Sequence, residues 1–342
     1  MSDFTNPLAN PLTNPLTDVI VIGGPTASGK SGLALAIAEG FGGTVINADS
    51  MQLYADLDVL TARPPAEDLA RAPHRLYGVL PAAERGSAAR WREMALAEIA
   101  AARAEGRLPV VVGGTGLYLR ALMQGLSEVP PIPDEVRAAA HARLAAIGGE
   151  AFRAELVARD PASAKLNPGD TTRLTRAWEV LEATGHPLSH WQSRTAQGAP
   201  ADLRFTILVL DPPRADLYAQ CDRRFDLMME QGALEEVRRL DALAREQALA
   251  PDLPVLKALG VPELRRVLHG EIPLDEAIAL ARQSTRRYAK RQVTWFRHQI
   301  VGKSPDMLVS HTGQHSCHTI DLPCSLAVRN AMLDRLRTIL NY

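Results

Sequence analysis

Short apolar runs alternate with amphipathic stretches along most of this chain. The first run, Val-Ile-Val-Ile at 19–22, is closed by two glycines, as is typical of a buried parallel strand. Comparable runs recur at 44–48, 76–80, 109–112 and 205–210. Helical patterns, such as those at 30–40 and 88–104, separate most of them. This alternation predicts an α/β fold with a parallel sheet flanked by helices.

The pattern changes in the middle of the chain. From 127 to 200, β-branched runs are absent and stretches rich in Ala, Leu, Arg and Glu predominate, which predicts an all-helical insertion domain. Residues 214–297 again look helical, with breaks near 250–254 and 270–273. The predicted organisation has four parts. They are a disordered leader (1–17), a catalytic core in two segments (18–126 and 201–303), the insertion (127–200) and a variable C-terminal tail (304–342).

A phosphate-binding loop follows the first apolar run and makes the predicted sheet a P-loop-type sheet. Residues 24–31 match the pattern G-x-x-x-x-G-K-[ST]. Glycines let the backbone N–H groups turn inward, and the following helix start adds partial positive charge. Lys30 supplies a point charge, and the Ser31 hydroxyl can reach a phosphate or Mg²⁺, so Ser31 is the candidate metal ligand. The residues expected to bind a diphosphate or triphosphate are Gly24, Pro25, Thr26, Ala27, Ser28, Gly29, Lys30 and Ser31.

By itself this loop favours ATP or GTP as the ligand of a kinase or an ATPase. In such enzymes an acidic residue at the end of another strand holds Mg²⁺, but the run 109–112 leads directly into two glycines. The nearest carboxylate is that of Asp49, which follows the second run. Strand ends of a parallel sheet face the ligand crevice, so we expect Asp49 near the bound phosphates. It could act there as a base, a Mg²⁺ ligand or a helix N-cap.

The total charge indicates no polyanionic partner, because 38 basic residues face 39 acidic ones. Any contact with nucleic acid therefore requires a local patch. The segment 282–297 is such a patch, with six Arg or Lys residues and no acidic residue. Helical spacing places Arg286 beside Lys290, and Arg287 beside Arg291, in a geometry that suits phosphate oxygens. In isolation, a charged solvated helix face is the alternative interpretation.

Other totals set broad limits. The three cysteines lack the number and spacing of a disulfide framework, which fits a reducing cytoplasm. No apolar run approaches the length needed to cross a bilayer, so no membrane association is expected. With 46% hydrophobic residues the chain can bury a sizeable core. For the oligomeric state, a monomer is the simplest expectation.

Six segments occur in a fixed order along the chain: GPTASGKS, ADSMQLY, TARP, GGTGLY, TTRLTRAWEV and TRRYAKRQVTWFR. With these motifs, residues 18–300 resemble the tRNA dimethylallyltransferases, also called isopentenyltransferases. The resemblance implies that the P-loop holds the diphosphate of dimethylallyl diphosphate and not ATP. It also implies transfer of the dimethylallyl group to N6 of an adenine next to the anticodon, on its 3′ side, to give N6-(dimethylallyl)adenosine and diphosphate.

The resemblance assigns catalytic roles to three residues. Ser31 and Arg224, together with Mg²⁺, would neutralise the charge that grows on the departing diphosphate. Gln220 stands where the family often has Arg, which leaves Arg224 as the better anchor in that helix. Asp49 would orient N6 and accept its proton. A carboxylate cannot deprotonate a neutral aryl amine beforehand, so proton transfer must accompany or follow C–N bond formation.

The same resemblance, together with the basic segment, predicts the tRNA-binding residues. They are Asp49, Ser50, Met51, Gln52, Thr115, Arg137, Thr172, Arg173, Leu174, Thr175, Arg176, Arg286, Arg287, Lys290 and Arg291. A stacked anticodon-loop base cannot present N6 to a buried carbon atom, so the target base is expected to be extruded.

Two other functions stay open at this point. A small-molecule or nucleotide kinase could use the P-loop, Lys30 and Asp49 with ATP and an acceptor hydroxyl. A non-catalytic RNA-binding protein could retain the P-loop without using it.

Overall fold

The computed structural model describes residues 17–193, 198, 200–301, 316–320 and 326–340. The chain divides into two compact units, one made of 1–123 and 199–342 and the other of 124–198. Of the predicted leader only Thr17 is described, and it is the first residue of strand β1. The other leader residues lie outside the described residues.

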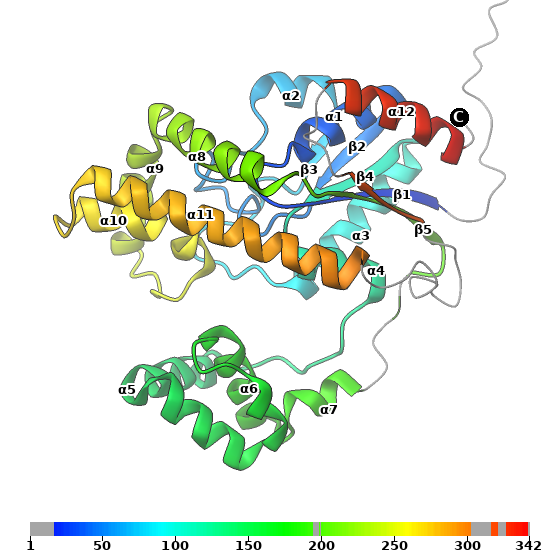
Figure 1. Cartoon of the computed structure of the whole chain (residues 1–342). Helices are drawn as coiled ribbons and strands as arrows, with labels where there is room; N and C mark the ends of the chain where they lie inside the picture. The colour runs from blue at the N-terminus through cyan, green and yellow to red at the C-terminus, as the bar shows by residue number, and fades with distance from the viewer. Residues whose placement is uncertain (1–16, 194–197, 199, 302–315, 321–325, 341–342) are drawn as a thin grey trace, which may run out of the picture. The chain divides into compact units, whose positions relative to one another are not determined.

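The larger unit is built on a parallel sheet (Figure 1). Its six described strands have the spatial order β3-β2-β4-β1-β5-β6. They are β1 Thr17–Gly23, β2 Gly43–Asn47, β3 His74–Arg75, β4 Leu108–Gly113, β5 Leu203–Leu210 and β6 Ser316–Ile320. Each described pairing is parallel, so the sheet confirms the predicted α/β fold.

Alternate residues of the central strand face two separate hydrophobic clusters, as the period of a strand requires. Val19 and Val21 belong to one cluster, and Ile20 and Ile22 belong to the other. Helices α1 (Lys30–Phe41) and α12 (Leu326–Leu340) contribute side chains to the cluster that contains Ile20. The opposite cluster takes residues from α3 Ala88–Ala104, α4 Gly116–Gln124, α8 Arg214–Glu230, α9 Ala233–Glu246, α10 Val261–Leu268 and α11 Leu274–Phe296. The sheet is therefore buried on both faces.

Most predicted helices are present. Helices α1 and α3 confirm the predictions for 30–40 and 88–104. The predicted breaks fall between α9 and α10, where a short 3₁₀ turn covers Pro254–Lys257, and between α10 and α11. Gly232, with φ of 94°, adds a break between α8 and α9. No helix in the described part of the chain has the length and apolar content needed to span a membrane.

The strand predicted at 76–80 is wrong. Only His74–Arg75 pairs with β2, and Leu80 makes an isolated bridge to Tyr54. Leu76 and Gly78 have φ of 63° and 62°, a left-handed conformation that cannot continue a strand. Conversely, β6, which pairs with β5, lies in the segment 304–342 that is predicted to be a variable tail.

The smaller unit contains only helices among its described elements. These are α5 Asp134–Arg159, the 3₁₀ helix Pro161–Lys165, α6 Thr171–Thr184 and α7 Leu188–Ser193. Helix α5 is kinked at Gly148, where φ is 74°. Phe152 and Leu156 of α5 pack against Leu174 and Leu181 of α6, so the unit has a small core of its own.

Candidate active site

The phosphate-binding loop connects the end of β1 to the start of α1 (Figure 1). Gly29 precedes the helix with φ of 85°, and Ala27 has φ of 61°, which is unusual for a residue with a side chain. The Ser28 hydroxyl is buried and has no hydrogen-bond partner among the described residues. Buried polar groups are normally paired, so this hydroxyl fits a loop that receives a ligand oxygen.

Two half-buried cations meet at this loop. Lys30 donates from Nζ to the Pro25 carbonyl at 3.1 Å. Burial lowers the pKa of Lys30 to about 8, with Asp49 opposing this shift and Arg224 adding to it. Arg224 extends from α8 and donates to the Thr26 hydroxyl, and burial also lowers the pKa of Arg224. Cations that are deprived of water in this way favour an anionic ligand.

Asp49 occupies a tight turn at the end of β2. Its Oδ1 accepts from the Met51 N–H at 3.0 Å, and its own N–H donates to Asn47 Oδ1 at 2.8 Å. No helix begins at Asp49, so the helix-cap alternative is wrong. The Ser50 N–H donates to Thr115 Oγ1 at 3.0 Å, which joins the turn to the loop after β4. The structure thus brings Asp49, Ser50 and Thr115 together.

Glycines at the end of β4 and in the loop after it are needed because other groups lie very close. A Cβ atom on Gly113 would lie 2.1 Å from the Ala48 carbonyl oxygen, and one on Gly116 would lie 2.3 Å from the Trp295 ring. Real Cβ atoms do not approach other atoms this closely. These glycines let the turn before Asp49 and the helix α11 approach the same loop.

Gln292 of α11 is a site residue that the sequence did not identify. Its side chain is buried, with Oε1 accepting from the Thr26 N–H at 2.8 Å and Nε2 donating to the Gly114 carbonyl at 2.9 Å. The surrounding segment is basic, and nothing in the local pattern distinguishes a buried Gln from an exposed one. Only tertiary packing shows its two partners.

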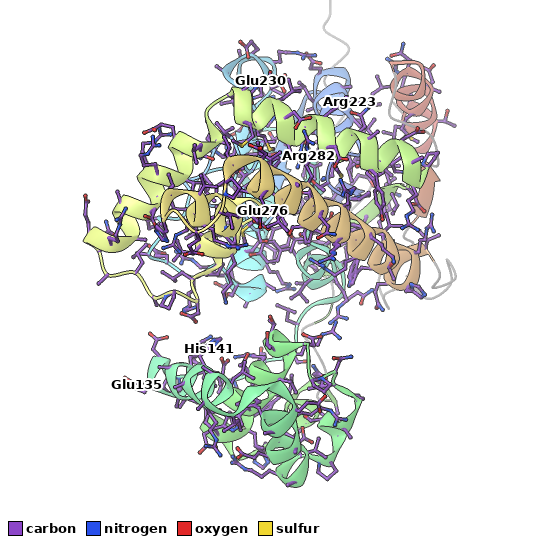
Figure 2. The ribbon with its side chains drawn as sticks, turned by 60° about the vertical axis from the view of Figure 1, so that its left-hand side comes forward. Glu135, His141, Arg223, Glu230, Glu276 and Arg282 are labelled. Atoms are coloured by element: carbon purple, nitrogen blue, oxygen red, sulfur yellow. The ribbon has the colours of Figure 1, made fainter. Side chains whose placement is uncertain are left out.

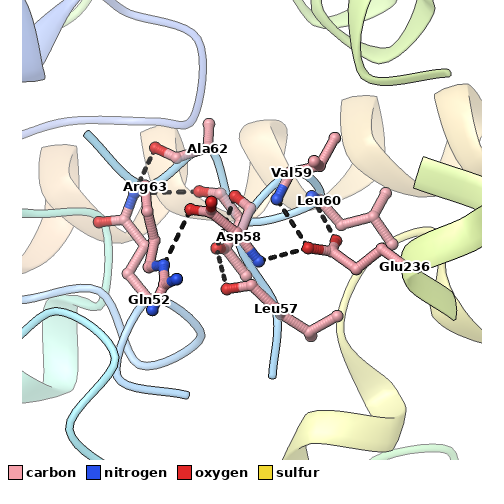
Figure 3. Close-up of polar contacts among 9 residues, drawn as sticks. Gln52, Leu57, Asp58, Val59, Leu60, Ala62, Arg63 and Glu236 are labelled. Carbon is pink, nitrogen blue, oxygen red and sulfur yellow. Dashed lines mark hydrogen bonds and ion pairs between the residues drawn. The ribbon is translucent and has the colours of Figure 1, made fainter. Parts of the chain in front are cut away.

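Two side chains, Gln52 and Glu236, hold the loop after Asp49 (Figure 3). Gln52 donates from Nε2 to the Thr61 and Ala62 carbonyls at 3.0 and 2.9 Å. The buried Glu236 carboxylate of α9 accepts three successive backbone N–H groups, those of Asp58, Val59 and Leu60, at 2.5, 2.8 and 2.9 Å. Gln52, a predicted tRNA contact, therefore has its amide nitrogen engaged within the loop.

The basic residues of α11 fall into two groups. Arg286 binds both oxygens of Asp222 at 2.6 and 2.8 Å, and Arg282 in Figure 2 lies between α11 and α8, where it pairs with Asp226. Arg287 and Lys290 are exposed and form no ion pair within the described residues. The exposed Arg291 lies over the Tyr288 ring, 5.5 Å from its centroid. The outer face of α11 therefore retains three accessible cations: Arg287, Lys290 and Arg291.

In the smaller unit the predicted tRNA-binding residues divide between core and surface. Leu174 and Thr175 are buried, and the Thr175 hydroxyl donates to the Thr171 carbonyl at 2.9 Å. Thr172 and Arg173 are exposed. Burial lowers the pKa of Arg176, Glu179 opposes this shift, and the nearby Arg137 of α5 adds to it. The unit thus places two like charges, Arg137 and Arg176, close together.

The chain is similar to known proteins over most of its length. Residues 52–299 match the family model described as IPP transferase, which covers more than half of the chain. The chain belongs to the IPP transferase family. The tRNA dimethylallyltransferase of Rhodospirillum centenum is 62% identical over 284 residues, covering 83% of this chain and 89% of that protein. That of Gluconobacter oxydans is 51% identical over 303 residues, covering 87% and 90%.

Solved structures extend the likeness to the fold of this IPP transferase. The full-length tRNA isopentenylpyrophosphate transferase of Bacillus halodurans is 28% identical, with a TM-score of 0.59, over 95% of this chain and 99% of that one. A eukaryotic dimethylallyltransferase acting on tRNA is 27% identical, with a TM-score of 0.73, over 95% and 80%. The chain is accordingly an enzyme, a transferase built on the fold of this family.

Proposed function

We propose that this IPP transferase moves the dimethylallyl group of dimethylallyl diphosphate to N6 of an adenine in the tRNA anticodon loop. The adenine lies next to the anticodon on its 3′ side, and the products are N6-(dimethylallyl)adenosine and diphosphate. The observation that carries the proposal is the pairing of a cationic cup, formed by Lys30 and Arg224 at the P-loop, with the carboxylate of Asp49. We assign this activity to a monomer, the simplest expectation, in the reducing cytoplasm that the cysteine content indicates.

The leaving group requires the cationic cup. As the C1–O bond of the donor breaks, its electron pair stays with the diphosphate, and negative charge accumulates there. Burial has already removed part of the water around Lys30 and the Thr26-bound Arg224, so stabilising this charge requires less loss of water. The unpaired Ser28 hydroxyl supplies a further donor.

The acceptor requires the carboxylate. The N6 lone pair forms the new bond to C1, and the nitrogen then carries positive charge and must lose one proton. Asp49 accepts that proton once the C–N bond is forming, because only then is the nitrogen acidic enough for a carboxylate. Its turn is fixed by Asn47 and by the Ser50–Thr115 contact, which favours a group with one orientation.

The residues at the loop also fit Mg²⁺. Ser31 is exposed at the first turn of α1, where its hydroxyl offers the hard oxygen ligand that Mg²⁺ prefers alongside phosphate oxygens. We propose Ser31 as the protein ligand. Bound Mg²⁺ would neutralise part of the diphosphate charge.

The tRNA would be held by charge outside this cup. Arg287, Lys290 and Arg291 on α11 are exposed cations that can neutralise backbone phosphates. In the smaller unit, Arg137 and Arg176 lie near each other, with Asp134 and Glu179 as their carboxylate partners, and we propose that both contact tRNA phosphates. Thr172 and Arg173 are accessible in the same unit.

The test uses labelled dimethylallyl diphosphate and an anticodon stem-loop RNA with adenine on the 3′ side of the anticodon. We expect label in the RNA without ATP. A matched RNA with purine riboside in place of that adenine lacks N6 and should accept none. Label in the second RNA, or phosphate transfer from ATP without RNA labelling, would contradict the proposal.

The Asp49→Asn variant separates catalysis from binding. We expect it to bind the stem-loop with nearly wild-type affinity and to lose transfer by about 10²–10⁴-fold, the usual contribution of a positioned proton acceptor. A non-catalytic RNA-binding protein would show no transfer in either form.

A further inference from the structure

A single buried side chain connects the donor and acceptor halves of the site. Gln292 lies on α11, and its amide bridges the P-loop and the loop after β4. The residue is only 5% exposed. It neither lies on the exposed basic face of α11 nor supplies a charge, so the proposed chemistry gives it no role so far.

On the donor side, Gln292 fixes Thr26. The Thr26 N–H donates to Gln292 Oε1 at 2.8 Å, and the Thr26 hydroxyl accepts a hydrogen bond from the Arg224 guanidinium. Thr26 therefore cannot shift without disturbing the cation that faces the leaving group. Gln292 therefore fixes the position of Thr26 and, through it, of Arg224 in the cationic cup.

On the acceptor side, Gln292 fixes Gly114. Its Nε2 donates to the Gly114 carbonyl at 2.9 Å, and a Cβ atom at Gly114 would lie only 2.2 Å from that nitrogen. The next residue, Thr115, accepts from the Ser50 N–H, which follows Asp49 directly. The position of the Asp49 turn is thereby linked to the same amide.

We propose that Gln292 is a positioning residue that fixes the spacing between the diphosphate cup and the acceptor carboxylate. This inference rests on the proposed function. An amide both accepts and donates, which the two opposite partners, an N–H and a carbonyl, require. Glutamate of the same length offers only the acceptor when ionised, and methionine offers neither. Misplacement of reacting groups by about 1 Å can lower the rate roughly 100-fold.

Two variants test the proposal. Gln292→Met removes both hydrogen bonds, whereas Gln292→Glu keeps the acceptor for Thr26 and removes the donor for Gly114. Ser284→Ala is the matched control on the same helix. It removes the 2.7 Å hydrogen bond from Ser284 to Glu263 of α10, at a distance of about 12 Å along the helix. Each protein is assayed for kcat, for the KM of donor and of stem-loop RNA, for inhibition by diphosphate and for thermal unfolding.

We expect both Gln292 variants to lower kcat by about 10–100-fold, with both KM values and the diphosphate inhibition constant changed by less than about threefold. Ser284→Ala should keep wild-type kcat. If Gln292→Met does not fold, Gln292→Glu decides the matter by the same criteria. Wild-type kcat per folded molecule in both variants, or a rise in KM alone, overturns the inference. Absence of transfer by the wild-type protein refutes the proposed function itself and the inference with it.

Discussion

The ammonium group of Lys30 should make donor use depend on pH. Its pKa is lowered to about 8, chiefly by burial, with Asp49 opposing the shift and the nearby Arg224 adding to it. The charged form is the one that attracts diphosphate, and it is lost as the pH rises through this value. At a pKa of about 8, the charged fraction falls from about 90% at pH 7 to about 10% at pH 9.

The quantity to measure is kcat/KM for the donor, because it reports the pKa values of the free enzyme. At saturating RNA we expect it to fall about thirtyfold between pH 7 and pH 9.5, which is the ratio of charged Lys30 at these two pH values. The loss should follow a single titration near pH 8. Increasing donor concentration should restore much of the rate, since bound diphosphate raises the pKa of Lys30.

Lys30→Arg is the control, because arginine stays charged across this range. Its kcat/KM should be lower at pH 7, since the guanidinium does not reproduce the 3.1 Å contact to the Pro25 carbonyl. It should then stay flat to pH 9.5. A flat wild-type profile, or the same decline in the Lys30→Arg protein, would refute this role for Lys30.

Three further predictions concern the supports of the site. Glu236→Gln should lower the free energy of unfolding by about 1–3 kcal/mol, because an amide leaves at least one of the three N–H groups that Glu236 binds without an acceptor. Urea unfolding measures this, and unchanged stability would contradict it. Gly113→Ala should abolish transfer, since its Cβ would meet a backbone oxygen at 2.1 Å, whereas Gly198→Ala, with open space around it, should stay active in the same assay. Arg287→Ala should weaken RNA binding and reduce its salt slope by about one, while Arg286→Ala should mainly reduce stability through its lost ion pair. An unchanged salt slope in Arg287→Ala would reject the phosphate contact.

The sequence by itself determined the parallel sheet and the position of the phosphate-binding loop. Both are local patterns: an apolar run such as 19–22, closed by two glycines, is typical of a strand buried between others, and the Gly-Lys-Ser ending of the loop needs a strand before it and a helix after it. The order of six motifs was sufficient to indicate the family. The strand expected at 76–80 failed for a local reason, because positive φ values at Leu76 and Gly78 interrupt it.

Tertiary structure decided which polar side chains serve the site and which serve the fold. Nothing local distinguishes Arg286, paired with Asp222, from the exposed Arg287 beside it. In the sequence, Gln292 and Glu236 look like ordinary polar residues of helices. In the structure, each binds backbone groups of a loop that is distant in the sequence. Hydrogen-bond partners far apart in the chain are fixed only when helices pack on the sheet, so one sequence, however clear its motifs, leaves these roles open.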